Sequence, residues 1–224
     1  MNLERNLIEQ IEFFNCLTDQ EKEYLSTRSE IKVKGRYNYI YLADEPSTYM
    51  NILLKGTIKI GTHSTDGKEI IKSIIHPQAI FGEMCMMGEK KRIDFAKSMS
   101  DGVEYFTVSN TVMMELMSKN KELSSCFMNN VGLRLKTAET RLESLIFKDA
   151  RSRIIDFLKD SVERRGRKVG FEMMFKHSLT QQDIANLTGT SRQTVTSVMN
   201  ELRKNNLIYF TRKSILVRDM AKLA

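Results

Sequence analysis

Two short helical segments between residues 180 and 202, separated by a glycine, constrain the fold of this chain more than any other feature. Thr180 with Asp183 three residues later is a helix-start signal, and Ser191 is a second one. Gly189 lies between them, where a left-handed residue commonly ends a helix. Apolar residues recur at helical spacing in both segments, at Ile184, Ala185, Leu187, Val195, Val198, Met199 and Leu202. This pattern predicts a helix-turn-helix.

The outward positions of the second segment carry hydrogen-bonding side chains. Its first turns present Arg192, Gln193, Thr196 and Ser197. Arginine pairs in a two-pronged manner with guanine and glutamine with adenine, and a recognition helix presents its first turns to the major groove. We therefore predict that these four residues read DNA bases. An ordinary helical hairpin with capped ends is the alternative.

Hydroxyl, amide and basic side chains surround the predicted helix pair. Helix starts offer N–H groups and hydroxyls to phosphates. The segment 205–210 turns at the basic residues 211–214 and returns at 215–217, which predicts a β-hairpin. Such a hairpin is typical of the wing of a winged helix, whose cationic tip adds phosphate contacts. The residues expected to contact phosphates are Thr180, Gln182, Ser191, Thr194, Arg212 and Lys213.

Positive charge is concentrated at the C-terminal end of the chain. From residue 151 onward there are 15 Lys and Arg against 7 Asp and Glu, whereas residues 1–150 hold 20 against 21. A segregated basic end favours a polyanionic partner, either nucleic acid or an acidic membrane surface, with a solubilising surface as the alternative. No apolar run approaches a membrane span. Together with the predicted helix-turn-helix, the basic end leads us to expect DNA and no membrane as the partner.

Residues 31–108 have a β-favouring texture. Short apolar runs at 31–33, 39–42, 50–54, 58–60, 70–75 and 105–108 are separated by turn residues, and Asp66-Gly67 is a hairpin signal. Many short strands at regular spacing predict a β-barrel or jelly roll, and hence an α+β chain. Short helices are expected before residue 30, where Thr18 and Glu21 form a capping pair.

One long helix is predicted from 121 to 148. Its apolar residues step by three or four, close to a coiled-coil seam: Phe127, Val131, Leu135, Ala138, Leu142 and Leu145. The narrow stripe favours a homodimer seam over a helix packed on its own barrel. Asp149 is the predicted N-cap of a helix over 150–163, followed by a basic turn at 164–168 and a strand at 169–176. We expect three parts: a sensor barrel (1–120), a dimerisation helix (121–148) and a DNA-binding domain (149–224).

The cysteines and histidines form no metal pattern. Cys16, Cys85 and Cys126 stand far apart, without the spacing of a zinc site, an iron–sulfur site or a disulfide framework, and the three histidines are equally scattered. We therefore expect neither haem nor an iron–sulfur cluster. The N-terminal residues lack the apolar core of a signal peptide, which predicts a cytoplasmic protein.

A second motif lies between the predicted strands and the long helix. It consists of Phe81-Gly82-Glu83-Met84 followed by Arg92. With this motif and the helix-turn-helix, nearly the whole chain resembles the Crp–Fnr family of transcription regulators, in whose barrels such a cassette binds a cyclic nucleotide. The resemblance implies that Gly82 admits a phosphate close to the backbone, Glu83 accepts a ribose hydroxyl and Arg92 neutralises the phosphate.

Two departures from the family pattern argue against cyclic AMP. Ile93 stands where members that bind cyclic AMP have a small hydroxyl residue, and Ala138-Glu139 stand where they have Thr-Ser. We therefore expect a different small effector or none, with a cyclic nucleotide disfavoured and no certain cofactor. The residues assigned to the effector pocket are Gly82, Glu83, Met84, Arg92, Ile93, Ala138 and Glu139.

The combined interpretation is a homodimeric transcription regulator that binds a near-palindromic operator, with RNA polymerase as a further partner if it is an activator. Gln193 and Ser197 replace residues that are usually Glu and Arg in the family, which predicts an altered half-site. A cyclic-nucleotide-binding module acting on a protein partner is the alternative, and the basic C-terminal end counts against it. No enzyme is expected, because the sequence offers no nucleophile–base set.

Overall fold

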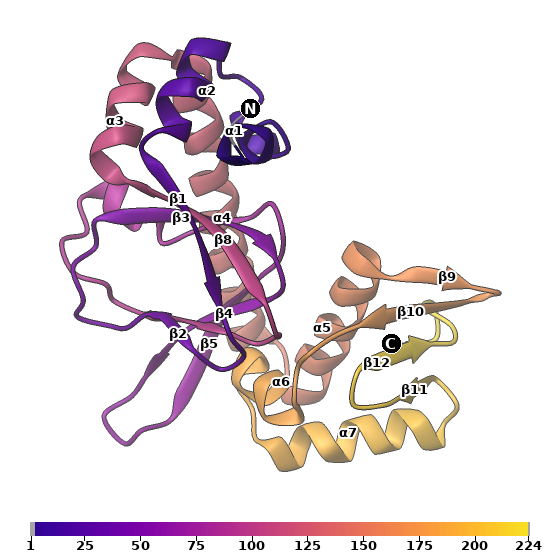
Figure 1. Ribbon diagram of the computed structural model, residues 1–224. Coiled ribbons are helices and arrows are strands. Elements are labelled where there is room, and N and C mark those ends of the chain that lie inside the picture. The colour runs from indigo at the N-terminus through magenta and orange to yellow at the C-terminus, as the bar shows by residue number, and fades with distance from the viewer. Residues whose placement is uncertain (1–2, 224) are drawn as a thin grey trace. The chain divides into compact units, whose positions relative to one another are not determined.

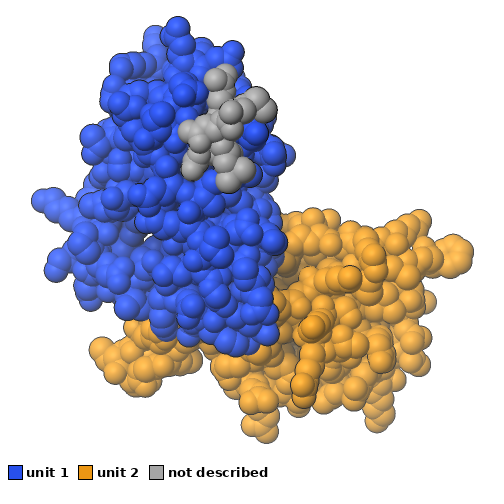
Figure 2. Space-filling model, in the orientation of Figure 1, with its two compact units in different colours: residues 1–62, 72–136 blue, residues 63–71, 137–224 orange. Residues whose placement is uncertain are grey.

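The computed structural model of the protein describes residues 3–223, which form two compact units. Unit 1 contains the described residues up to Thr62 together with Lys72–Lys136, and unit 2 contains His63–Ile71 together with the residues from Thr137 onward (Figure 2). Unit 1 holds most of the strands, whereas unit 2 combines helices with a small sheet (Figure 1).

Unit 1 is built on two four-stranded β-sheets, with strand orders β1-β8-β3-β6 and β2-β7-β4-β5. The strands are β1 (Ser29–Lys34), β2 (Tyr39–Tyr41), β3 (Tyr49–Lys55), β4 (Ile58–His63), β5 (Glu69–Ile75), β6 (Ile80–Phe81), β7 (Phe95–Ser98) and β8 (Val103–Ser109). Neighbours along the chain, such as β1 and β2 or β7 and β8, lie in different sheets, as in a jelly roll. The predicted jelly-roll barrel is confirmed.

Strands β3 and β8 are buried on both faces. Met50 and Ile52 of β3 join an apolar cluster with Phe106 of β8. Leu53 and Tyr105 point the other way, because side chains alternate along a strand, and join a second cluster. This second cluster draws residues from both sheets and forms the interior of the barrel.

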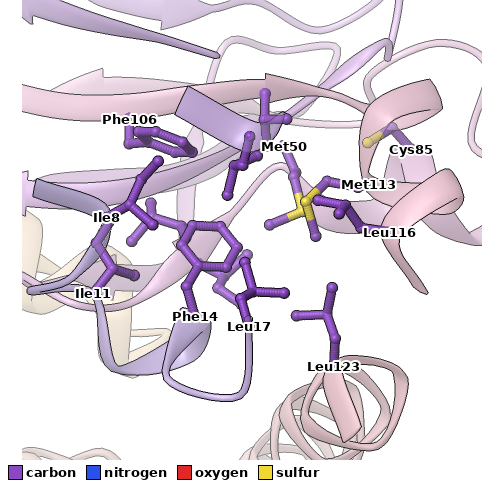
Figure 3. Packing of buried hydrophobic residues seen from close by; sticks show 14 residues of the cluster. Ile8, Ile11, Phe14, Leu17, Met50, Cys85, Phe106, Met113, Leu116 and Leu123 are labelled. Carbon is purple, nitrogen blue, oxygen red and sulfur yellow. The ribbon is translucent and has the colours of Figure 1, made fainter. Parts of the chain in front are cut away.

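Short helices cover the other face of β3 and β8. They are α1 (Leu3–Ile8), η1 (Glu12–Phe14), α2 (Asp19–Ser26) and α3 (Asn110–Lys119). Ile8 and Phe14 are fully buried in the cluster that contains Met50 (Figure 3). Helix α2 begins at the predicted capping pair: the Thr18 hydroxyl accepts a hydrogen bond from the Glu21 N–H at 3.3 Å, and the Glu21 carboxylate accepts one from the Thr18 N–H at 2.8 Å.

Helix α4 (Lys121–Phe147) has 27 residues and is shared by the units, which divide after Lys136. Asn120 holds its start by accepting a hydrogen bond from the Leu123 N–H at 3.0 Å. Leu123 and Phe127 are its buried residues. Seven large apolar side chains after them are exposed: Met128, Leu133, Leu135, Leu142, Leu145, Ile146 and Phe147.

Unit 2 contains the second half of α4, three further helices and a four-stranded sheet of order β11-β12-β10-β9. The elements are α5 (Ala150–Arg165), β9 (Arg167–Val169), β10 (Glu172–Lys176), α6 (Gln181–Thr188), α7 (Arg192–Lys204), β11 (Ile208–Phe210) and β12 (Ser214–Val217). Asp149 caps α5 as predicted, because its carboxylate accepts a hydrogen bond from the Ser152 N–H at 2.7 Å. The predicted winged helix-turn-helix is confirmed.

The prediction for residues 164–176 is wrong. Residues 164–168 are not a basic turn, because α5 continues to Arg165 and β9 begins at Arg167. The predicted strand 169–176 is instead a hairpin, since Gly170 adopts a left-handed backbone (φ +62°) and reverses the chain between β9 and β10. Strands β6 and β7 were not predicted, because β6 has only two residues and two of the four residues of β7 are polar.

Candidate nucleic-acid interface and effector cassette

The helix-turn-helix is set by three local signals. Thr180 and Asp183 exchange hydrogen bonds at the start of α6, with the Asp183 N–H donating to the Thr180 hydroxyl at 3.1 Å and the Thr180 N–H to the Asp183 carboxylate at 2.9 Å. Gly189 ends α6 in the left-handed region at φ +62°. The Ser191 hydroxyl accepts a hydrogen bond from the Thr194 N–H at 3.0 Å and so starts α7.

Two arginines from neighbouring helices hold the turn between α6 and α7. Arg153 of α5 donates from Nε to the Thr188 carbonyl at 2.8 Å and from Nη2 to the Gly189 carbonyl at 3.1 Å. Arg141 of α4 donates to the Leu187 carbonyl at 2.9 Å. The last carbonyls of a helix have no partner within it, so both guanidinium groups satisfy acceptors that the helix leaves open. Burial lowers the pKa of Arg141.

The predicted base-reading residues differ in their availability. Arg192, Gln193 and Ser197 are exposed on α7. Thr196 is half-buried, and its hydroxyl is within hydrogen-bond distance of Gln181 Oε1 at 2.7 Å and of the Arg192 carbonyl at 2.9 Å. Three of the four side chains are therefore presented to solvent, whereas the Thr196 hydroxyl is occupied between α6 and α7.

The predicted phosphate contacts fall into two groups. The hydroxyls of Thr180 and Ser191 are both occupied as helix caps. The Gln182 amide donates to Asn186 Oδ1 within α6 at 2.8 Å, and the Thr194 hydroxyl shares a hydrogen bond with that of Ser191 at 2.8 Å.

The two basic residues stand apart from this group. Arg212 and Lys213 are exposed in the turn between β11 and β12, which the Thr211 N–H closes by donating to the Ser214 carbonyl at 2.8 Å.

The effector cassette, residues 81–93, has as its second residue a glycine that its surroundings require. Gly82 follows β6 and precedes the short helix η2 (Glu83–Met87), with a left-handed backbone at φ +69°. A Cβ atom at this position would lie 3.0 Å from Arg92 Nη1 and 3.1 Å from Asn51 Nδ2. Both the backbone conformation and the close approach of Arg92 therefore favour glycine.

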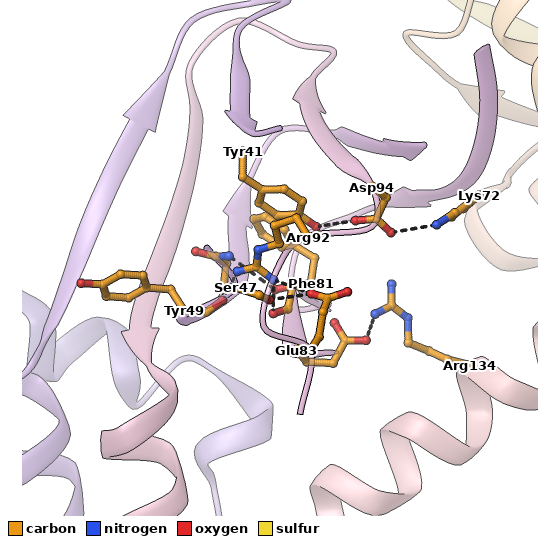
Figure 4. A network of polar contacts seen from close by, with 12 residues as sticks. Tyr41, Ser47, Tyr49, Lys72, Phe81, Glu83, Arg92, Asp94 and Arg134 are labelled. Atoms are coloured by element: carbon orange, nitrogen blue, oxygen red, sulfur yellow. Dashed lines mark hydrogen bonds and ion pairs between the residues drawn. The ribbon is translucent and has the colours of Figure 1, made fainter. Parts of the chain in front are cut away.

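Arg92 is buried and is engaged by the barrel itself (Figure 4). Its guanidinium donates to the Gly82 carbonyl at 2.6 Å and also to the Tyr49 carbonyl, and it pairs with Glu89 at 3.7 Å. It also lies over the Tyr41 ring, 4.4 Å from the ring centroid. The group expected to meet a ligand anion thus already has a carboxylate, two carbonyls and an aromatic face as partners.

Glu83 is paired in the same way. Its side chain is 2% exposed and forms an ion pair with Arg134 of α4 (Figure 4). Burial lowers the pKa of Arg134. The second carboxylate oxygen of Glu83, Oε2, is buried and has no hydrogen-bond partner among the described residues. Arg134 was not among the predicted residues, because a single cation on a polar stretch of helix gives no sequence signal of a buried partner.

The remaining predicted effector residues lie outside this network. Met84 and Ile93 are exposed by 42% and 62%. Ala138 and Glu139 are exposed residues of the half of α4 that belongs to unit 2. Their contribution to an effector pocket stays a prediction, while Gly82, Glu83 and Arg92 are brought together by the barrel.

The residues of the predicted dimer seam lie in different environments along α4. Phe127 is 2% exposed in the interior of unit 1, so it is unavailable to a partner helix. Val131 is half-buried and Ala138 is exposed. The leucines at 135, 142 and 145 are exposed by 61%, 59% and 47%.

Residues 3–223 contain neither a membrane-spanning helix nor a cluster of metal ligands. No helix there combines the length and the hydropathy that crossing a bilayer requires. That part of the chain also brings together no group of three His, Cys, Asp or Glu side chains placed to hold a metal ion.

Both halves of the chain match known domain families. Residues 35–120 match the cyclic nucleotide-binding domain, and residues 152–224 match the Crp-like helix-turn-helix domain. Among characterised relatives, the CRP-like cAMP-activated global transcriptional regulator of Mycobacterium tuberculosis is 28% identical over 189 residues, 84% of each chain. The global nitrogen regulator of Synechococcus elongatus is 25% identical over 213 residues, covering 94% of this chain and 96% of the relative.

Solved structures share the same fold. FixK2 from Bradyrhizobium japonicum superimposes with a TM-score of 0.78 at 19% identity, over 87% of this chain and 95% of that one. A mutant of CooA from Carboxydothermus hydrogenoformans superimposes with a TM-score of 0.76 at 20% identity, over 92% and 88%.

Proposed function

Since this chain belongs to the Crp–Fnr family of transcription regulators, we propose that it acts as a homodimer whose two α7 helices read a near-palindromic DNA operator. One observation carries the proposal. Arg192, Gln193 and Ser197 project from the first turns of a helix whose preceding turn is fixed by Arg141 and Arg153. The turn between α6 and α7 is held by other residues than those that face solvent on α7. The exposed side chains of α7 are therefore available to bind base edges.

Selection of bound sequences from random DNA tests this proposal. The expected result is two inverted half-sites whose centres lie about one helical turn, roughly 34 Å, apart. Gln193 favours adenine where Glu would favour the amino group of cytosine, so the half-site should carry adenine at the position that Gln193 reads. Recovery of one unrepeated site, or of no preferred sequence, would contradict the proposal.

The stripe on α4 supports the dimer. Phe127 is buried, so the exposed stripe begins at Met128 instead. The stripe then advances in steps of three and four residues, through Met128, Val131, Leu135, Ala138, Leu142 and Leu145. This is the spacing of a two-helix seam. An exposed row of large apolar side chains is favourable only when another surface covers it.

Sedimentation of two matched variants tests the seam. Leu135→Glu places a charge in the seam and should shift the protein to monomers and abolish operator binding. Leu133→Glu is the control, because Leu133 is as exposed (66% against 61%) but lies roughly 200° around the helix from Leu135. Equal effects of both substitutions, or a monomeric parent protein that still binds the operator, would contradict the dimer.

We propose that this regulator either responds to a small molecule other than cyclic AMP or has no small-molecule effector. Arg92 and Glu83 already have partners within unit 1, and Ile93 offers no hydrogen bond to a phosphate. The mycobacterial relative is cAMP-activated, and that property is not carried over to this chain. Calorimetric titration with cyclic AMP should give no binding heat, and micromolar affinity would overturn this interpretation.

The proposed partners follow from the proposed operator. Binding to chromosomal DNA places the protein in the cytoplasm, and an activator would also contact RNA polymerase. Transcription in vitro from a template that carries the selected operator distinguishes an activator from a repressor. Addition of the regulator should raise the amount of transcript if it is an activator and lower it if it is a repressor.

A further inference from the structure

The turn of the β4–β5 hairpin belongs to unit 2. Strands β4 and β5 are neighbours in a sheet of the barrel, but residues 63–71, which are the turn and the adjoining strand ends, are part of unit 2 (Figure 2). Ser64 closes the turn: its N–H donates to the Lys68 carbonyl at 2.9 Å, and its hydroxyl accepts from the Lys68 N–H at 3.1 Å. The hairpin therefore presents its side chains at defined positions.

Glu69 of this hairpin is hydrogen-bonded to α6. Its Oε1 accepts from Asn186 Nδ2 at 3.0 Å, and its side chain is 19% exposed. The side-chain oxygen of Asn186 in turn accepts from the Gln182 amide at 2.8 Å. Because Gln182 and Asn186 are four residues apart, they lie on the same face of α6. The three side chains form one chain of hydrogen bonds, which ends on a residue predicted to contact phosphate.

A second contact holds the hairpin to the same end of α6. Arg141 donates from Nη1 to the Ile71 carbonyl at 3.4 Å and from Nη2 to the Leu187 carbonyl at 2.9 Å. One guanidinium group thus joins the end of the hairpin to the last turn of α6. Two independent contacts therefore fix residues 63–71 beside this turn.

The charge of Glu69 opposes DNA at this position. A carboxylate and a DNA phosphate are both anions, and they repel each other within a Debye length of about 8 Å at physiological salt. Asn186 also lies in the last turn of α6, where the helix dipole disfavours a negative charge. The contact therefore competes with phosphate binding on this face, and α6 itself adds no electrostatic stabilisation to it.

We propose that residues 63–71 are an autoinhibitory latch on the helix-turn-helix, in which Glu69 holds Asn186 in a closed state that DNA must open. The proposal rests on the proposed function, because its output is DNA binding. In the closed state the Gln182 amide is directed to Asn186, and a carboxylate lies on the same face of α6. In the open state the amide is available to a phosphate and the carboxylate has moved away. The apparent affinity for DNA then scales with the open fraction.

The affinity of Glu69→Ala for DNA tests the latch. Loss of the hydrogen bond to Asn186 should favour the open state and raise affinity by roughly 3- to 10-fold, measured by fluorescence anisotropy of the labelled operator. The gain should be similar on random DNA, because phosphate contacts carry no sequence information. An unchanged or weaker affinity would overturn the proposal, since the hairpin would then be neutral or would assist binding.

Two variants of equal charge separate the latch from a general effect of charge. Glu69→Gln and Asp66→Asn each remove one negative charge from the hairpin, but the printed partner of Asp66 is the Ser64 hydroxyl within the turn. Glu69→Gln keeps an acceptor for Asn186, so its gain should be smaller than that of Glu69→Ala and should decrease as salt screens the charge. Asp66→Asn should leave affinity unchanged. Equal gains in both variants would overturn the latch.

The other side of the contact provides a coupling test. Asn186→Ala should also raise affinity, and the double variant with Glu69→Ala should gain less than the product of the two single gains, because both remove the same hydrogen bond. Gains that multiply in full would show that the two residues act independently, which contradicts the proposal.

The outcomes distinguish the latch from the proposed function. If the parent protein selects an operator and Glu69→Ala binds it no better, only the latch fails. If neither the parent protein nor any variant binds DNA, the proposed function fails and the latch with it. Binding by Glu69→Ala but not by the parent protein would be the strongest support. Should Glu69→Ala fail to fold, the comparison of Glu69→Gln with Asp66→Asn decides.

Discussion

The cassette of unit 1 and the helix-turn-helix of unit 2 both depend on arginines, but they use them differently. In unit 2, Arg141 and Arg153 hold the turn, and a separate residue, Arg192, faces solvent. In unit 1, Arg92 is both the group expected to meet an effector and the group that binds the Gly82 and Tyr49 carbonyls. Substitutions in the recognition helix therefore test binding alone, whereas substitutions in the cassette test folding first.

Loss of Arg92 should have the largest effect of any substitution considered. Arg92→Leu removes a buried cation and leaves Glu89 and two carbonyls without it, so the free energy of unfolding of unit 1 should fall by about 3–5 kcal/mol. Six of the seven tyrosines belong to unit 1, so urea unfolding followed by tyrosine fluorescence reports on it.

Arg192→Ala is the matched control for this experiment. Arg192 is exposed, and its loss should change the stability by less than about 0.5 kcal/mol. If Arg92→Leu changed the free energy of unfolding as little as Arg192→Ala, the contacts of Arg92 would not stabilise the cassette. The contrast between the two units would then be contradicted.

Arg192→Ala should instead weaken DNA binding. Loss of a two-pronged contact with guanine removes about 1–3 kcal/mol of discrimination, so affinity for the selected operator should fall roughly 5- to 150-fold with little change on random DNA. Lys213→Ala should weaken both DNAs alike and reduce the slope of log affinity against log salt by about one unit. Equal losses on both DNAs for Arg192→Ala would remove its base-reading role.

The features that could be predicted from sequence are those that local signals define. Thr180, Gly189 and Ser191 mark helix ends within a few residues of their hydrogen-bond partners, and the structure has the helices where these residues indicate. The β-runs of the barrel were visible for the same reason, because alternating burial leaves a local pattern.

The features that could not be predicted depend on partners far away in sequence. Arg134 and Glu83 are an ion pair between α4 and the cassette, and Arg153 reaches carbonyls 35 and 36 residues away. A polar residue on a helix looks the same in sequence whether it is solvated or paired. The burial of Phe127 could not be predicted for a similar reason. Some apolar residues of α4 pack in the core of unit 1 and others form the exposed stripe, and the sequence does not distinguish the two sets.

Thr180→Ala tests whether a hydroxyl expected to contact phosphate is mainly structural. The Thr180 hydroxyl accepts from the Asp183 N–H at the start of α6, so its removal should lower the stability of α6 by about 1 kcal/mol. Amide hydrogen exchange in α6 measures this change. Thr180→Ser should restore protection, and Gln182→Ala, which removes no cap, should leave it unchanged. Full protection in Thr180→Ala would return the hydroxyl to a purely phosphate-binding role.

The smallest predicted effect is a pH dependence of the stability of unit 2. His177 precedes α6, and its Nδ1 accepts a hydrogen bond from the Leu179 N–H at 3.2 Å, while its buried Nε2 has no partner among the described residues. Burial, assisted by the nearby charge of Arg165, lowers the pKa of His177 below its ordinary value of about 6.5. The unfolded chain then binds a proton more readily than the folded chain, so the free energy of unfolding of unit 2 should fall as the pH drops below about 6.5.

Urea unfolding followed through NMR signals of methyl groups in unit 2 measures this dependence. His177→Asn keeps an acceptor for the Leu179 N–H but cannot titrate, so it should flatten the dependence below pH 6.5. His63→Asn, at a side chain that is 45% exposed, is the control and should retain it. Because the lost stability comes from protonating a buried ring beside α6, the acid sensitivity should reside in unit 2, and an equal acid response in His177→Asn would place its origin elsewhere in the chain.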